Sequence, residues 1–159
     1  MKEKLSTRKL TRLSLLIAIS AVAAYIPLPS PIGTVALDSA PGYFAALIYG
    51  GVPGAVVLSL GHIFSALKMG FPLGSIHLLI SVLMGGCGLV YYQVKIKFNL
   101  ISASLIGILL NGISIAFLLI PLLGVGFFLS MTGSLLLGAT ANIILAGILY
   151  RVLKEKINL

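Results

Sequence analysis

Residues 27–50 read PLPSPIGTVALDSAPGYFAALIYG, and this stretch divides the chain into two unlike parts. It holds four of the seven prolines and, at Asp38, the only acidic residue away from the two ends of the sequence. A basic segment and an apolar segment precede it, and nearly uncharged apolar sequence follows it. A Pro/Gly-rich loop with one carboxylate, in such a chain, indicates a segment that binds a ligand or caps a helix.

The composition indicates a membrane protein. Of the 159 residues, 59% are hydrophobic and 9% are charged, whereas a soluble domain carries roughly 25% charged residues. So few charges cannot cover a water-facing surface, and we therefore expect an integral membrane protein. The length predicts a single all-α domain over residues 1–159, without room for a soluble catalytic or nucleotide-binding domain.

Apolar runs separated by Pro/Gly turns predict a bundle of six transmembrane helices. We expect the spans at residues 10–26, 38–49, 53–67, 75–92, 100–119 and 126–149. The second and third are short for a bilayer core, which needs about 20 helical residues. They are therefore either tilted helices inside the bundle or one re-entrant hairpin, and their many small residues favour burial between other helices.

The basic residues predict which side of the membrane each loop faces. They gather in a tail at about residues 1–9 and on to Arg12, in the turn at Lys95 and Lys97, and after the last span. Cytoplasmic loops carry such an excess of Lys and Arg, so we expect both termini in the cytoplasm and the loop at about 27–37 outside. The net charge of +8 is then explained by orientation and lipid contact rather than by nucleic acid.

Four ionisable side chains fall near membrane depth, where such groups are costly and usually functional. Asp38 is either the N-cap of the second span or a hydrogen-bond acceptor for a ligand. His62 and His77 contact a ligand, or else they are a buried imidazole and an interfacial anchor. Lys68 is either a charge that snorkels to the interface or a contact for an anionic group.

Two amides lie inside the last two spans, and Asn111 and Asn142 either bond between helices or contact the ligand. Motifs of nucleotide binding and hydrolysis are absent, because the sequence contains no Walker A run, HExxH, GxSxG or paired carboxylates. The spacing of the histidines matches no metal motif, so we expect no metal. The lone Cys87 predicts a buried small side chain.

Three segments carry a resemblance to a known family. They are the basic start TRKLTRLSLLIAISAVAAYI, the loop SPIGTVALDSAPGYFAAL, and the run GHIFSALKMGFPLGSIHLLI. Over about residues 7–153 their order and spacing resemble the substrate-binding S component of an energy-coupling factor (ECF) vitamin transporter. Within that family the chain looks most similar to the group assigned to α-ribazole, a nucleoside precursor of the cobalamin lower ligand.

The resemblance implies a ligand site on the outer side, covered by the first loop as a lid, with lid residues Ser30, Pro31, Gly33 and Thr34. It implies a multi-pass protein of the bacterial cytoplasmic membrane that docks on a transmembrane coupling (T) subunit with two cytosolic ATPases. Those partners would use ATP, and the chain itself would bind no cofactor. In the family, docking uses an alanine-xxx-alanine pattern on the first helix, which corresponds here to Ser14 and Ala18, with Ala21 nearby.

A nucleoside needs apolar stacking for its base and hydrogen bonds for its ribose. The resemblance therefore implies substrate contacts from seven residues: Asp38, Tyr43, His62, Phe71, His77, Asn111 and Asn142. Two other readings of the sequence stay open at this point: a small intramembrane enzyme that uses Asp38 and the histidines, and a ligand-free structural subunit of a membrane complex.

Overall fold

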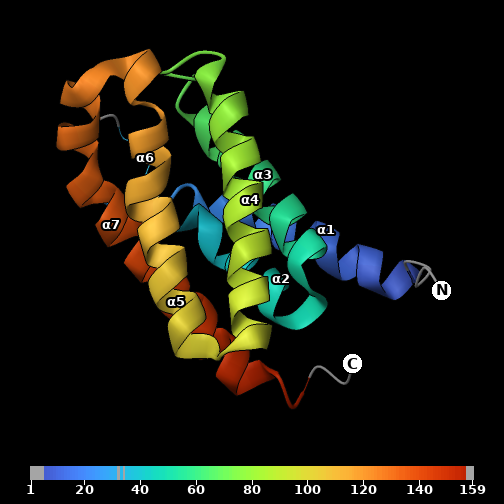
Figure 1. The fold of residues 1–159 in the computed structure, drawn as a ribbon. Helices are drawn as coiled ribbons and strands as arrows, with labels where there is room; N and C mark the ends of the chain where they lie inside the picture. The colour runs from blue at the N-terminus through green and yellow to red at the C-terminus, as the bar shows by residue number, and fades with distance from the viewer. Residues whose placement is uncertain (1–5, 32, 34, 157–159) are drawn as a thin grey trace.

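The structure is a computed structural model that describes residues 6–31, 33 and 35–156, and it is built from helices (Figure 1). In chain order these are α1 (Thr7–Ala23), the 3-10 turn η1 (Leu37–Ser39), α2 (Ala40–Tyr49), α3 (Gly51–Lys68), α4 (Ile76–Lys97), α5 (Leu100–Leu109), the π-helical turn η2 (Leu110–Ser114), α6 (Ile115–Leu118) and α7 (Ile120–Leu153). Because α5, η2 and α6 follow one another without a break, the described residues form six helical rods. The all-α prediction is confirmed.

The first helix lies three residues earlier in the chain than the sequence indicated. Ser6 is its N-cap, and the Ser6 hydroxyl accepts a hydrogen bond from the backbone N–H of Lys9 at 3.2 Å. The helix ends at Ala23, ahead of the prolines that start at Pro27, since each proline disfavours helix in the residue before it. In the fold, α1 packs against α2 and α3, and its N-terminal half points away from the other helices (Figure 1).

The second helix is short and lies inside the bundle. It contacts α1, α3, α4 and α7, and all its residues from Ala40 to Leu47 are buried. Gly50, with a positive φ of 102°, makes the tight turn into α3. A Cβ on Gly54 would clash with Ala46, so the small residues let α2 and α3 approach closely, as the sequence indicated.

The membrane-crossing prediction is confirmed in part. Four segments are long and apolar enough to cross a bilayer: Gly51–Lys68, Ile76–Lys97, Leu100–Leu118 and Ile120–Leu153. Helix α1 has 17 residues and α2 has 10. Ten helical residues rise about 15 Å, half of a hydrocarbon core of about 30 Å, so α2 alone cannot cross it.

Two features differ from the helices expected at 100–119 and 126–149. The fifth rod is not a uniform α-helix, because it contains the π-turn η2. The loop expected at 121–125 is only a kink within α7, where Gly124 has a φ of 80°. Pro121 sits in the first turn of that helix, where the missing N–H of proline costs nothing, so proline did not mark a longer loop.

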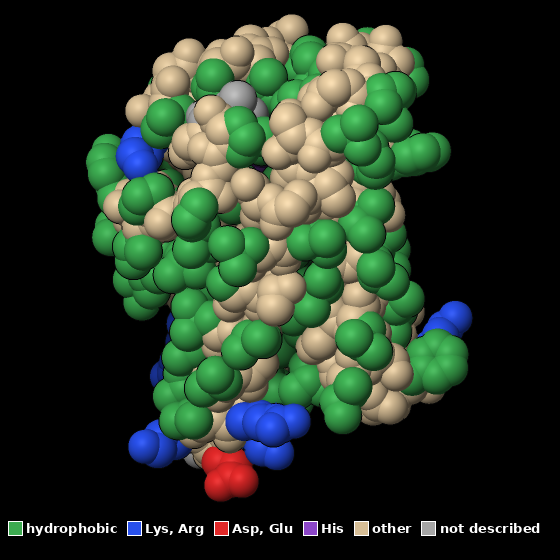
Figure 2. All heavy atoms as spheres, turned by 90° about the vertical axis from the view of Figure 1, so that its left-hand side faces the viewer, with side chains coloured by type: hydrophobic (Ala, Val, Ile, Leu, Met, Phe, Trp, Pro, Cys, Tyr) green, Lys and Arg blue, Asp and Glu red, His purple; other side chains and the backbone are tan. Residues whose placement is uncertain are grey.

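The outer surface has the character of a lipid-facing wall. Figure 2 shows hydrophobic side chains over much of the visible face, with most of the visible Lys and Arg side chains in its lower half. Lys95 and Lys97 end α4, and Arg151 lies in the last turn of α7. The α4–α5 turn and the end of α7 lie at the same end of the molecule (Figure 1), which groups these charges as the sequence predicted.

Candidate ligand-binding pocket

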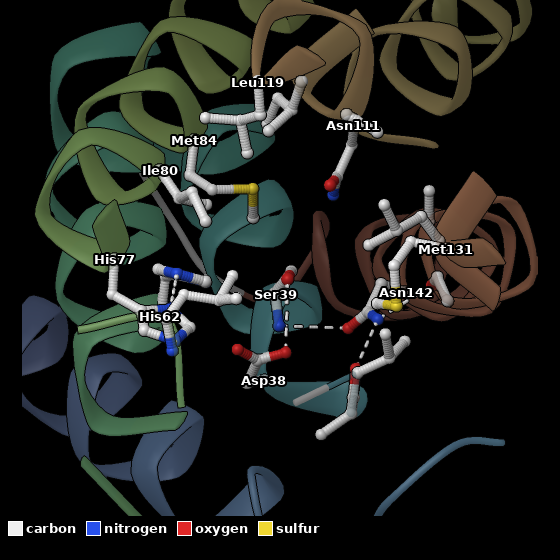
Figure 3. A pocket seen from close by; sticks show the side chains of 18 of the residues that line it. Asp38, Ser39, His62, His77, Ile80, Met84, Asn111, Leu119, Met131 and Asn142 are labelled. Carbon is white, nitrogen blue, oxygen red and sulfur yellow. Dashed lines mark hydrogen bonds between the residues drawn. The ribbon is translucent and has the colours of Figure 1, made fainter. Parts of the chain in front are cut away.

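A pocket opens between the lid loop, η1, α3, α4, the π-turn and α7 (Figure 3). It contains about 660 Å³ of unfilled space, including its open mouth. Its polar lining residues are Asp38, Ser39, His62, His77, Asn111 and Asn142. The rest of its wall is apolar: Val35, Ala36, Leu73, Ile80, Met84, Ile115, Ala116, Leu119, Phe127, Met131, Leu135, Gly138 and Ala139.

The structure brings five of the seven expected substrate-binding residues into this one pocket, from five different elements. Tyr43 and Phe71 are not among the lining residues. Tyr43 is fully buried, and its hydroxyl accepts a hydrogen bond from Nδ2 of Asn111 at 3.1 Å. Phe71 packs edge-on against His77, with 5.9 Å between ring centroids. Both aromatic residues therefore support lining residues from behind.

Asp38 is a buried carboxylate in η1, with 5% of its surface exposed. The hydroxyl of Ser39 donates a hydrogen bond to its Oδ1 at 3.3 Å, and Ser65 of α3 is a further hydrogen-bonding partner. Among the described residues it has no ion pair with a lysine, arginine or histidine. A buried carboxylate is costly without a compensating partner, so the pocket retains an acceptor that suits a ligand's donor groups.

Asn142 of α7 caps α2, a role that the sequence reading left open for Asp38. Its Oδ1 accepts the backbone N–H groups of Ser39 at 3.0 Å and of Ala40 at 2.7 Å. Its Nδ2 donates to the carbonyl oxygens of Ala36 and Gly138, each at 2.8 Å. Both amide atoms thus already hold two protein partners. Asn142 therefore lines the pocket, but its amide atoms bond to the protein and clamp the lid and α2 to α7.

The π-turn η2 carries Asn111 into the pocket wall. Nδ2 of Asn111 donates to Tyr43, and no hydrogen bond from the described residues reaches its Oδ1. π-turns inside α-helices are frequent at functional sites. The following residue, Gly112, has no Cβ, and one would come within 2.8 Å of the Leu136 side chain, so α7 lies close to this turn.

The two histidines form a direct contact on the opposite side of the pocket from Asn142 (Figure 3). Nε2 of His62 lies 3.1 Å from Nδ1 of His77. Nε2 of His77 in turn accepts the backbone N–H of Leu73 at 3.3 Å. His77 is 1% exposed, while His62 is only partly buried. The histidine pair is thus bonded to the loop between α3 and α4.

The lid is held at its base, where its two ends pair with each other. Leu28 donates its backbone N–H to the carbonyl of Val35 at 2.9 Å, and Pro27 pairs with Ala36. Val35 and Ala36 line the pocket, and Val35 packs so closely on Gly138 that a Cβ there would clash. The expected lid residues Ser30, Pro31 and Gly33 belong to this loop, and Thr34 lies outside the described residues.

Lys68 points away from the pocket. Its Nζ donates to the carbonyl of Ala24 at 3.0 Å and lies 5.0 Å from the centroid of the Tyr25 ring. It therefore bonds to a carbonyl group at the C-terminal end of α1 and contributes no charge to the lining.

The face of α1 that is expected to dock a T subunit is open to another helix. Ser14 and Ala18 are exposed there, and Ala21 is partly buried.

The sequence reading did not identify the apolar wall of the pocket or Ser39. Met84, Leu119, Phe127 and Met131 lie in helices that are apolar on every side, so hydrophobicity does not distinguish the residues that face the pocket. Asn111 was identified as a polar point within an apolar span, but its π-helical backbone was not. The Asn-Gly pair in that span was the only local signal of a break.

The fold is helical, with four segments long and apolar enough to cross a membrane, and it contains a pocket with an apolar wall and a few polar groups. A family model described as the ECF transporter, substrate-specific component, matches residues 8–156, and the chain belongs to this family. Searches of curated proteins and of solved structures found no match. The family consists of substrate-binding subunits that act with a T subunit and ATPases.

Proposed function

We propose that this chain is the S component of a bacterial ECF transporter in the cytoplasmic membrane, and that its ligand is α-ribazole. In this proposal the chain captures the nucleoside from the outer side under the lid. It then delivers it inward while docked through α1 on a T subunit, which two cytosolic ATPases drive. The chain carries out no covalent step.

The combination of a largely apolar wall with a few polar groups in the pocket lining carries the proposal. Small-molecule sites are mostly apolar pockets with a few placed polar groups. Here Met84, Leu119 and Met131 offer apolar surface for a flat heterocycle. Asp38 and Asn111 offer oxygen acceptors for sugar hydroxyls. A nucleoside with a benzimidazole base likewise combines an apolar heterocycle with a sugar that carries hydroxyl groups.

The charge of the lining narrows the ligand class further. Asp38 brings a carboxylate, and the lining contains no lysine or arginine. Placing an anionic group beside a buried carboxylate without a neutralising cation costs several kcal/mol. The pocket therefore favours the free nucleoside over its phosphate ester.

Thermal unfolding of the purified chain in detergent tests this proposal. A ligand at a thousandfold excess over its Kd adds about 4 kcal/mol to the free energy of unfolding. The panel contains α-ribazole, riboflavin, thiamine, pantothenate and cobalamin, with the phosphate ester of α-ribazole as the matched control. We expect α-ribazole alone to raise the midpoint. If another compound raises the unfolding midpoint, that compound is the ligand in place of α-ribazole. If no compound raises it, the proposal is contradicted.

A further inference from the structure

The hydrogen bonds around the two histidines determine where their protons lie. A backbone N–H can only donate, so Nε2 of His77, which accepts from Leu73 at 3.3 Å, must carry a lone pair. The proton of His77 is then on Nδ1, the atom that lies 3.1 Å from Nε2 of His62. His77 is therefore the donor in the contact between the two rings.

The same reasoning extends to His62. Its Nε2 accepts from His77, so its own proton is on Nδ1. Neither ring can carry a second proton while this chain of bonds is intact, because each Nε2 is already an acceptor. The loop backbone at Leu73 thus sets the tautomer of a side chain in the pocket through one intervening imidazole.

The Nδ1 atom of His62 has no hydrogen-bond partner among the described residues. Three buried side-chain atoms of the described chain lack a partner, namely Ser20 Oγ, Ser30 Oγ and Tyr91 Oη. Because His62 Nδ1 is not one of them, this atom reaches accessible space. His62 lines the pocket and is partly exposed, so its N–H is available to a ligand.

We infer that His62 Nδ1–H is a built-in hydrogen-bond donor of the pocket, and that His77 is the positioning residue that holds it in this tautomer. With Asp38 as an acceptor in the same lining, the pocket selects a ligand that presents an in-plane acceptor, such as an unprotonated ring nitrogen, together with hydroxyl donors. This inference rests on the proposed function, since it assigns a ligand contact to the same pocket.

Nitrogen-15 labelling of histidine tests the proton positions without any ligand. The chain has two histidines, so long-range proton–nitrogen spectra of the full-length protein show two imidazoles, which His62→Gln assigns. We expect both rings to be neutral and protonated on Nδ1. His77→Leu removes the donor to His62 and should shift His62 toward the Nε2–H tautomer, whereas His77→Asn retains a donor and should restore Nδ1–H. A proton on Nε2 of His62 in the native chain overturns the inference.

Binding of two probes tests the contact itself. The first is α-ribazole, and the second is the corresponding indole riboside, which lacks the ring-nitrogen acceptor. We expect the native chain to bind the benzimidazole about tenfold more tightly. His62→Phe should abolish this preference, and His77→Asn should retain more of it than His77→Leu.

These two measurements separate the inference from the proposed function. If neither riboside binds the native chain, the α-ribazole proposal fails, and the labelled spectra still decide whether His62 carries its proton on Nδ1. If α-ribazole binds but the native chain and His62→Phe show the same preference, the nucleoside proposal stands and the assigned contact is wrong.

Discussion

Asn142 accepts a backbone hydrogen bond at the start of α2, with its Oδ1 2.7 Å from the backbone nitrogen of Ala40. The two residues are 102 positions apart in sequence, and the contact ties the last helix to the segment that carries Asp38. Because the same amide also holds the carbonyl of Ala36, one side chain positions both the lid and the carboxylate. Through this clamp, the lid and the start of α2 are both bonded to α7.

Replacing Asn142 with alanine should therefore loosen the site and destabilise the fold. Several buried backbone groups would lose their partner, at about 1–3 kcal/mol for each group left unsatisfied. We expect a loss of about 2–5 kcal/mol in the free energy of unfolding, measured by thermal or denaturant unfolding in detergent, together with weaker ligand binding.

Asn99→Ala is the matched control for the clamp. Asn99 caps α5 by accepting the backbone N–H of Ser102 at 2.9 Å, in an exposed position. Its loss should cost about 1 kcal/mol and leave ligand affinity unchanged. If Asn142→Ala is no more damaging than this control, Asn142 does not clamp the lid.

Asp38 should affect affinity more than stability. Asp38→Asn retains the shape of the side chain and removes a carboxylate that has no cationic partner among the described residues. We expect binding of α-ribazole to weaken by about 10- to 100-fold, the range for a hydrogen bond to a charged group, while the unliganded chain unfolds at the same or a higher temperature. Unchanged affinity in both Asp38→Asn and Asp38→Ala would show that the carboxylate is not a ligand contact.

The lid can be opened by a single methyl group. Gly138→Ala places a Cβ against Cγ1 of Val35, and the lid must move to relieve this clash. We expect faster ligand dissociation, measured by stopped-flow or surface plasmon resonance, with little change in the association rate. Gly147→Ala, on the same helix, introduces a Cβ with nothing within 4 Å, and equal dissociation rates in the two variants would rule out this role for the lid.

The exposed face of α1 should matter for uptake but not for binding. Ala18→Trp adds bulk where a partner helix must approach closely, so we expect ligand affinity to persist while uptake by cells with the T subunit and ATPases is lost. Ile19→Trp is the control, because Ile19 is 43% exposed and lies about 100° further round the helix. Uptake that survives in Ala18→Trp would place the docking face elsewhere.

The helices were largely predictable because prolines, glycines and small residues mark their ends and contacts. Ser6, a capping residue, extends α1 backward beyond its apolar run, and Pro121 is accommodated within a helix, so hydropathy misplaced both of those boundaries. The π-turn that begins beside Asn111 packs through Gly112 against Leu136 of α7, which is a tertiary contact. The Asn111–Gly112 pair is the only local pattern in the sequence that points to it.

The polar part of the site was predictable for a different reason. A rare charge or amide is conspicuous in an apolar chain, so Asp38, His62, His77, Asn111 and Asn142 were identified as site residues and do line one pocket. Their individual roles were not predictable, because these depend on partners far away in sequence. Both amide atoms of Asn142, for example, bond to the backbone, and the tautomer of His62 depends through His77 on the backbone of Leu73.

Calorimetric titration of the purified chain with α-ribazole and with its phosphate ester measures directly whether the pocket binds the free nucleoside. We expect one molecule of α-ribazole bound per chain, with the phosphate ester at least about 100-fold weaker because the carboxylate of Asp38 has no cationic partner among the described residues. Absence of α-ribazole binding, or equal affinity for the phosphate ester, would contradict this expectation.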